Sequence, residues 1–309
     1  MLAGNIGALT AQSGSSPDWK KQMGLELYTV RDLMDKEFEG TLAKVAAIGY
    51  TEVEPTSYGG LDPKQLRALL DRYGLTAPST HAGATDGPDL EKQLEGFQIM
   101  GIKYTEISGS RPAGGRGGDA AAGARAQGAR SGGAAAQRPQ QTEESVKRTA
   151  AQINKHGEIA RKFGMKMLIH NHTQEFELLE GGQLRVYDVL LAETDPSLVA
   201  MQIDIGWAAV AGQNIIQMFK KTPGRFELWH VKDAIGIKSM YPSRTPGQRQ
   251  RGAYLVPVGQ VEVDYKAIFA NARLAGLKHF VIEQDNAAAW GDSMAAAKAS
   301  YQGLMKVLP

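Results

Sequence analysis

The segment MQIDIGW, residues 201–207, shows most directly how this chain folds. A short, mostly apolar run ends on Asp204, and a glycine and a tryptophan follow it. Two later segments repeat this order: LWHVKD at 228–233 closes on His230, and FVIEQD at 280–285 closes on Glu283. Short apolar runs rich in β-branched residues are typical of strands buried in a parallel sheet. We therefore predict three strands that each end on an ionisable residue.

The same kind of run recurs along most of the chain. From Gly24 onward, short apolar runs alternate with longer segments of helical spacing, the pattern of repeated βα units around a parallel sheet. Eight runs predict strands at residues 25–29, 51–55, 77–81, 104–108, 166–170, 201–204, 227–231 and 280–283. Glycine stands at five expected helix ends, at Gly49, Gly74, Gly101, Gly164 and Gly276. With 309 residues, we predict an α/β fold: one (β/α)8 TIM barrel over residues 23–309.

Three segments fall outside this repeat. Residues 1–22 are predicted to form a flexible N-terminus, and their apolar start, MLAGNIGALTAQSGSS, also fits the end of an export signal. The export signal would make the protein periplasmic, and the flexible terminus would leave it cytoplasmic. Residues 110–141 are largely Gly, Ala and Arg, so we predict a disordered, mobile insertion after the fourth strand. Residues 233–259 follow the carboxyl end of the seventh strand. They are expected either to contact the substrate or to serve only as a connection to the next element.

The composition excludes several kinds of partner and cofactor. The sequence has no cysteine, so thiolate nucleophiles and cysteine-bound metals are excluded, and any metal must be held by His, Asp and Glu. The formal net charge is +2, and no basic face indicates nucleic acid. No apolar run reaches the roughly 18 residues that span a bilayer, so no membrane segment is predicted. We expect a small sugar as partner and leave a homo-oligomer open.

The ionisable strand ends are the first candidates for a metal site. Asp204, His230 and Glu283 come from consecutive predicted strands, whose carboxyl ends meet at one face of a barrel. One such residue alone is explained by capping or a hydrogen bond. Three ionisable groups directed into a barrel are costly unless they are paired or bind a metal. The fifth strand ends in MLIHNHTQEF, residues 167–176, and offers three candidates for a fourth ligand: His170, His172 and Glu175.

Several segments together resemble one enzyme family. HNHTQEF at 170–176 is similar to the HNHxxEF segment of many xylose-isomerase-like sugar phosphate isomerases and epimerases. LYTVRD at 27–32 resembles the family's opening QLYSVRD, with Glu26 where Gln is usual, and VE at 53–54 resembles its second strand. HVKD at 230–233 extends the resemblance, whereas the 110–141 insertion is not a family feature.

The resemblance implies a metal set of Glu, Asp, His and Glu from strands five to eight. Asp204, His230 and Glu283 match the last three. At the end of the fifth strand, this chain has His170 where many members have glutamate, and its nearest carboxylate is Glu175. We favour Glu175 because hard divalent ions prefer carboxylate oxygen. His170 is the alternative, and its imidazole would favour Mn, Co, Zn or Fe over Mg.

Other residues are predicted to surround the metal. His81 is predicted to contact a substrate hydroxyl, with a structural, hydrogen-bonded histidine as the alternative. Glu54 either binds substrate or pairs with Arg31. Lys232 is predicted to neutralise a developing enolate, and the alternative is a salt bridge with Asp233. The rings of two aromatic residues are predicted to bind the sugar, namely Tyr28 and Trp207.

These residues together predict metal-assisted abstraction of a proton α to a carbonyl, through an enediolate. The base is drawn from His170 and His172, with Glu175 if it is not a ligand, and Lys232 assists. We predict an isomerase or epimerase, and the HNHxxEF resemblance implies a lyase acting on keto-inositols or 3-keto-glycosides as the alternative. An endonuclease for abasic DNA needs a histidine-rich trinuclear cluster, which six histidines and no basic groove do not favour. A non-catalytic sugar-binding barrel predicts that no metal binds.

Overall fold

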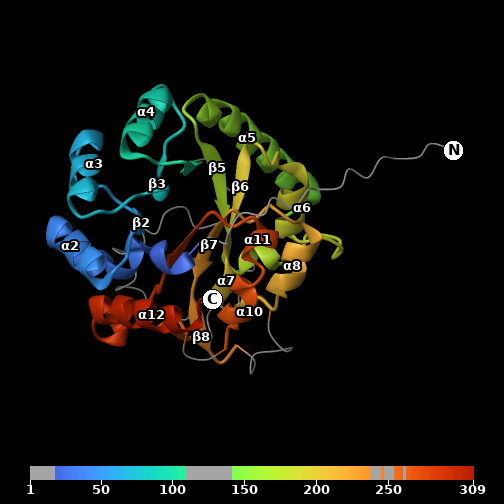
Figure 1. Cartoon of the computed structure of the whole chain (residues 1–309). Helices are drawn as coiled ribbons and strands as arrows, with labels where there is room; N and C mark the ends of the chain where they lie inside the picture. Colours follow the sequence, from blue (N-terminus) through green and yellow to red (C-terminus); the bar gives the residue numbers. More distant parts are fainter. Residues whose placement is uncertain (1–17, 109–140, 238–244, 247–253, 260–261) are drawn as a thin grey trace, which may run out of the picture.

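Eight parallel strands form the centre of the molecule in the computed structural model, which describes residues 18–108, 141–237, 245–246, 254–259 and 262–309 (Figure 1). The strands are β1 (Met23–Glu26), β2 (Glu52–Glu54), β3 (Ser79–Ala84), β4 (Tyr104–Ile107), β5 (Lys166–His170), β6 (Val199–Asp204), β7 (Leu228–Val231) and β10 (His279–Ile282). They pair in the order β2-β1-β10-β7-β6-β5-β4-β3. An isolated parallel bridge from Glu52 to Thr76 joins the two edges, with the Val53 amide donating to the Thr76 carbonyl at 2.8 Å. The predicted eight-stranded TIM barrel is confirmed.

Helices cover the outside of the barrel (Figure 1). They are α1 (Arg31–Met34), α2 (Phe38–Ile48), α3 (Pro63–Arg72), α4 (Leu90–Met100), α5 (Glu143–Lys162), α6 (Val186–Glu193), α7 (Ile205–Val210), α8 (Ile215–Lys221), α10 (Tyr265–Phe269), α11 (Ala272–Ala275) and α12 (Ser293–Val307). In α2 the apolar side chains of Leu42 and Val45, three residues apart and so on one face of the helix, are fully buried. Gly49 ends this helix with a φ of 119°, a conformation that favours glycine. The other four predicted glycines also have positive φ.

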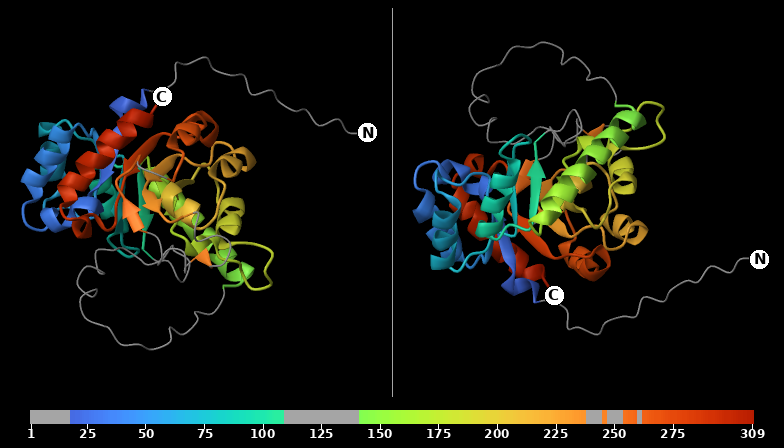
Figure 2. Two further views of the ribbon diagram at one scale, coloured as in Figure 1. Left: turned by 90° about the horizontal axis from the view of Figure 1, so that it is seen from below. Right: turned by 90° about the horizontal axis from the view of Figure 1, so that it is seen from above.

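The last helix completes the ring of helices, because α12 lies beside α2 (Figures 1 and 2). Tyr50, just after α2, donates a hydrogen bond of 2.8 Å to the Ala297 carbonyl, and its ring meets that of Tyr301 edge-on at 5.1 Å. The first and last βα units are thereby joined through their helices as well as through their strands, because β1 and β10 pair directly in register from Met23↔Phe280 to Leu25↔Ile282.

The barrel interior is filled with side chains below the level of the strand ends. Tyr104, Leu168, Ala200 and Leu228 form a separate buried cluster within it. Nearer the amino ends of the strands, Glu227 accepts a hydrogen bond of 2.8 Å from Tyr104. Because side chains alternate along a strand, residues two positions after this apolar layer point into the same interior space. The top of the barrel is therefore the place where inward-facing polar groups gather.

Some boundaries differ from those predicted. β1 ends at Glu26, and the chain enters a 3-10 turn at Leu27–Val30, so Tyr28 lies past the strand. The segment after β7 forms two antiparallel strands that were not predicted, β8 (Asp233–Ile235) and β9 (Tyr254–Val256). The segment that also fits an export signal, and all but the last residue of the 110–141 insertion, lie outside the described residues. Among the helices that the structure describes, none is long and apolar enough to cross a membrane.

Candidate active site

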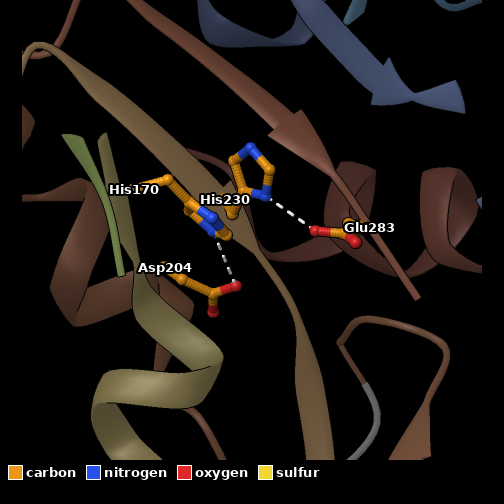
Figure 3. A group of neighbouring side chains, drawn as sticks. All are labelled: His170, Asp204, His230 and Glu283. Carbon is orange, nitrogen blue, oxygen red and sulfur yellow. Dashed lines mark hydrogen bonds and ion pairs between the residues drawn. The ribbon is translucent and has the colours of Figure 1, made fainter. Parts of the chain in front are cut away.

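Four predicted residues meet at the carboxyl ends of neighbouring strands. One donor atom from each of His170, Asp204, His230 and Glu283 lies within 4.8 Å of the others, and all four residues are buried. They come from β5, β6, β7 and the end of β10, which are adjacent in the sheet. Figure 3 shows the two pairings inside this quartet. His170 Nε2 lies 3.3 Å from Asp204 Oδ2, and His230 Nδ1 lies 2.7 Å from Glu283 Oε2.

Asp204 is held by the start of the helix that follows it. Its Oδ1 accepts a hydrogen bond of 2.8 Å from the Trp207 backbone amide and so caps α7. Its own backbone amide donates to Asn171 Oδ1 at 3.1 Å. The capping bond occupies Oδ1 and leaves Oδ2 directed at His170 and at Lys232 Nζ, which is 3.1 Å away. The capping role and the candidate ligand role of Asp204 therefore use different oxygens.

His230 has a carboxylate on each side of its ring. Nδ1 faces Glu283 of the quartet and also lies 3.1 Å from Glu26 Oε2, while Nε2 lies 2.9 Å from Glu54 Oε2. Metal-binding histidines usually hydrogen-bond to a carboxylate through the ring nitrogen that is not a ligand, which fixes the ring orientation. In this arrangement, Nδ1 is the donor atom available to the quartet and Glu54 orients the ring from behind.

A second set of polar residues lines the other half of the barrel top. His81 Nδ1 lies 2.9 Å from Glu26 Oε1, and His81 Nε2 lies 2.8 Å from Gln202 Oε1. The Gln202 amide nitrogen donates to both oxygens of Glu54, at 3.0 and 2.9 Å. Since the amide nitrogen faces the carboxylate, the amide oxygen must face His81, and both ring nitrogens of His81 meet acceptors. The His81 ring stacks on that of His230 at 5.0 Å.

Lys232 places its ammonium group among three carboxylates. Its Nζ lies 3.1 Å from Asp204, 2.7 Å from Glu283 and 2.6 Å from Asp285, and the side chain is 1% exposed. The predicted alternative, a salt bridge to Asp233, is not formed, because Asp233 Oδ1 accepts instead from the Ala234 amide. Lys232 Nζ also lies 5.4 Å from the centre of the Trp207 ring.

The buried charges shift one another's pKa values. Burial opposes protonation of His81, but the carboxylates of Glu54 and Glu26 outweigh it and raise the pKa of His81 to about 10. Burial opposes ionisation of Glu54, but His81 and His230 outweigh it and lower the pKa of Glu54 to about 2. Burial raises the pKa of Asp204 to about 7, although Lys232 opposes this shift. Burial and the neighbouring His230 hold the pKa of His170 well below its usual value. His170 is therefore neutral, the form in which imidazole binds metals.

The remaining predicted residues lie at the edge of the site. Glu175 is buried in a 3-10 turn, where its Oε2 accepts a hydrogen bond of 2.8 Å from the His172 backbone amide, and it is not part of the quartet. The His172 ring is 5.0 Å from that of His170 and 6.5 Å from that of Trp207. Trp207 is buried, and its Nε1 has no hydrogen-bond partner within the part of the chain that the structure describes.

Arg31 and Tyr28 form a pair of their own. The Arg31 guanidinium lies 3.8 Å from the centre of the Tyr28 ring. It donates to the backbone carbonyls of Tyr28 at 2.7 Å and of Asp285 at 2.9 Å. The pairing of Arg31 with Glu54 that was considered from the sequence is therefore not formed, since Glu54 contacts His230, Gln202 and His81. The other two histidines contact carboxylates outside this site: His156 contacts Asp86, and His279 contacts Glu52.

Sequence reasoning missed three residues of this site: Glu26, Gln202 and Asp285. Glu26 and Glu54 are direct neighbours in the β1–β2 register, and Gln202 lies two residues before Asp204 on the same side of β6. Because side chains alternate along a strand, counting back two residues from Asp204 would have identified Gln202 as a further inward-facing polar residue. Asp285 lies beyond the end of β10, and only its contact with Lys232 reveals it.

The donor set of the quartet fits a divalent metal ion. Two imidazole nitrogens and two carboxylate oxygens are buried together, and His230 has the outer carboxylate partner typical of metal-binding histidine. Mixed nitrogen and oxygen donors suit Mn, Fe, Co or Zn, and carboxylates also suit Mg.

Several known proteins with similar sequences or folds are named as enzymes. A family model described as xylose isomerase-like TIM barrel matches residues 42–300. An inosose dehydratase from Geobacillus kaustophilus is 26% identical over 269 residues, 80% of each chain. The fold matches a solved sugar phosphate isomerase/epimerase from Parabacteroides distasonis with a TM-score of 0.68 and 19% identity, over 97% of this chain and 98% of that one. It also matches a xylose isomerase-like TIM barrel protein from Mycobacterium smegmatis in complex with magnesium, with a TM-score of 0.55 and 14% identity, over 93% and 96% of the chains.

Proposed function

The chain belongs to the xylose isomerase-like TIM barrel family, and on that premise we propose that it is a metal-dependent enzyme that removes a proton next to the carbonyl of a sugar or keto-inositol. The observation that carries this proposal is the buried quartet of His170, Asp204, His230 and Glu283 at the carboxyl ends of four adjacent strands. Active sites of TIM barrels lie at this face.

We propose that Asp204, His230 and Glu283 hold the ion and that His170 is the fourth ligand. The sequence favoured Glu175 for this position, but the neutral imidazole of His170 lies within the quartet, whereas Glu175 accepts from a backbone amide. An imidazole-containing set favours Mn, Co, Zn or Fe over Mg, and we take manganese as the first ion to test. When bound, the ion supplies positive charge that polarises the substrate carbonyl and stabilises negative charge on its oxygen.

The chain's own residues supply the proton transfers. With His170 engaged as a ligand, His172 is the base proposed to take the α-proton, because its partly exposed ring lies beside both the quartet and Trp207. Lys232 and Trp207 are proposed to contact substrate oxygens. Lys232 provides an ammonium group beside Asp204 and Glu283, and Trp207 provides a buried N–H. Glu54 and His81 are proposed to act mainly by orienting His230 and Glu26, with any substrate contact limited to the exposed edge of His81.

Two outcomes of proton removal remain as candidates. Return of the proton to the neighbouring carbon, or to the opposite face, is isomerisation or epimerisation. Loss of a β-hydroxyl as water is a dehydration, and the inosose dehydratase relative favours this second candidate on a keto-inositol. Protonation of the leaving hydroxyl requires an acid, and the ammonium group of Lys232 is the proposed donor.

Metal content and proton exchange together test the proposal. The purified protein should contain about one divalent ion per chain, and Asp204→Asn should lose it. Asp195→Asn is the matched control, since Asp195 is exposed just before β6 and its amide replacement keeps an acceptor for the Ser197 backbone. Incubation with a keto-inositol and with ketohexoses in deuterated water should give deuterium α to the carbonyl, or an unsaturated product, only with the metal-loaded enzyme. A metal-free protein that exchanges no α-proton in any substrate would contradict the proposal and favour a sugar-binding barrel.

A further inference from the structure

Glu26 lies beside the quartet, although the sequence analysis did not identify it as a metal ligand. It is the last residue of β1, the strand that pairs with β10, and its side chain is 3% exposed. One oxygen, Oε1, lies 2.9 Å from His81 Nδ1. The other, Oε2, is buried and has no hydrogen-bond partner among the described residues, although it lies 3.1 Å from His230 Nδ1. A buried carboxylate oxygen without a hydrogen bond is costly and requires an explanation.

The geometry around His230 Nδ1 supplies this explanation. Two carboxylate oxygens face the same ring nitrogen, Glu283 Oε2 at 2.7 Å and Glu26 Oε2 at 3.1 Å. A single N–H group makes one well-aligned hydrogen bond, and Glu283 has the shorter contact. A metal ion has no such limit. Neighbouring donor atoms about 2.1 Å from an octahedral ion lie roughly 3 Å from one another, which is close to the distance of each of these two oxygens from His230 Nδ1.

From this arrangement we propose that Glu26 is a further ligand of the ion, through Oε2, so that the site combines three carboxylates with the imidazoles of His230 and His170. The inference rests on the proposed metal site and adds one ligand from the opposite side of the β10 strand. His81 then acts as a positioning residue, because its contact with Oε1 turns Oε2 towards His230.

The extra carboxylate has a consequence for the kind of ion. Glu26, Asp204 and Glu283 together carry three negative charges against two on the ion. Hard ions that accept several oxygen ligands are stabilised by such a set more than ions that prefer a four-coordinate site. The site should therefore bind manganese more tightly, relative to zinc, than a variant in which Glu26 is neutral.

The test compares manganese and zinc binding in four chelator-treated proteins: wild type, Glu26→Gln, Glu26→Asp and Glu52→Gln. Glutamine keeps the shape of Glu26 and can still accept from His81, but it removes the charge. Aspartate keeps the charge and withdraws the oxygens by one methylene. Glu52 is the matched control, since it is a buried glutamate on the neighbouring strand, in register with Gly24, and it pairs with His279 at the opposite end of the barrel.

We expect Glu26→Gln and Glu26→Asp each to weaken manganese binding by about 10-fold or more, since loss of even an outer-shell partner costs about 10–100-fold. Glu52→Gln should bind as wild type does. Circular dichroism of each chelator-treated variant establishes that it is folded. A structure of the wild type with manganese should place an oxygen of Glu26 within bonding distance of the ion.

Other results overturn the inference. Affinity within about twofold of wild type in both Glu26 variants would do so, as would a manganese structure in which Glu26 contacts only solvent or protein. Loss of affinity in Glu26→Gln with full retention in Glu26→Asp would reduce the role of Glu26 to its charge and also reject it as a ligand. Asp204→Asn separates the two proposals: if it binds metal as wild type does, the proposed function fails, whereas if only it loses the metal, the function stands and the Glu26 inference fails.

Discussion

Replacement of Lys232 by methionine tests the electrostatics of the site most directly. The ammonium group lies within 3.1 Å of Asp204, Glu283 and Asp285, and the side chain is 1% exposed. Burial opposes its charge, but Asp204, Asp285 and Glu283 outweigh burial and hold the pKa of Lys232 well above its usual value. Methionine fills a similar volume and leaves these carboxylates without their cation. We therefore expect the metal-free protein to lose stability.

The magnitude follows from the burial of the pair. Removal of one partner of a buried ion pair costs about 3–5 kcal/mol, because the remaining charge stays buried without compensation. For a domain of this size, 1 kcal/mol corresponds to roughly 2 °C, so the midpoint of thermal unfolding should fall by about 6–10 °C. Lys147→Met is the control, because Lys147 pairs with Glu143 on the exposed surface of α5 and should change the midpoint little.

Metal binding should offset the loss of the Lys232 charge. An ion between Asp204 and Glu283 neutralises the same carboxylates that Lys232 neutralises in its absence. Saturating manganese should therefore raise the unfolding midpoint of Lys232→Met more than that of wild type, and the difference between the two proteins should shrink. Scanning calorimetry with chelator and with manganese measures both quantities. An equal deficit of the variant under the two conditions would refute the proposed sharing of charge.

Three further predictions concern two residues of the site, His81 and Trp207, and one residue at the barrel floor, Glu227. The pKa of His81 is raised to about 10, so the stabilisation from its charge is complete below about pH 6.5 and is lost as the pH rises through 10. Over this range, the free energy of unfolding of the chelator-treated wild type should fall by up to about 1.4 kcal/mol per pH unit more than that of His81→Gln. Urea titrations at several pH values measure this difference. Trp207→Phe removes the buried N–H, so KM should rise several-fold, and an unchanged KM would exclude contact between the indole N–H and the substrate. Glu227→Gln weakens the contacts of Tyr104 and Lys166 at the barrel floor, so stability should fall while kcat stays at the wild-type value, measured in parallel unfolding and rate assays.

The alternation of strands and helices could be predicted from the sequence because it depends on local patterns. Apolar runs and helical spacing depend on neighbours within a few residues, and these patterns predicted all eight strands of the barrel. Asp204, His230 and Glu283 were also found in this way, because parallel strands bring their carboxyl ends to one face whatever the details of packing. The sequence by itself thus determined the barrel and three members of the quartet.

The tertiary structure decided which other side chains reach that face. β6 is buried along its whole length, so burial does not mark the inward side of the strand; the spacing of two from Asp204 indicates Gln202, but only the folded barrel shows that it contacts His81 and Glu54. The choice between His170 and Glu175 depends on the 3-10 turn after β5, which directs Glu175 to a backbone amide and leaves His170 in the quartet. Glu26 joins the site through His230, 204 positions later in the sequence, and Asp285 joins it through Lys232, 53 positions earlier. Contacts at such separations arise only when the barrel closes. Closure sets the distances between β1, β7 and the end of β10, and no local sequence pattern determines them.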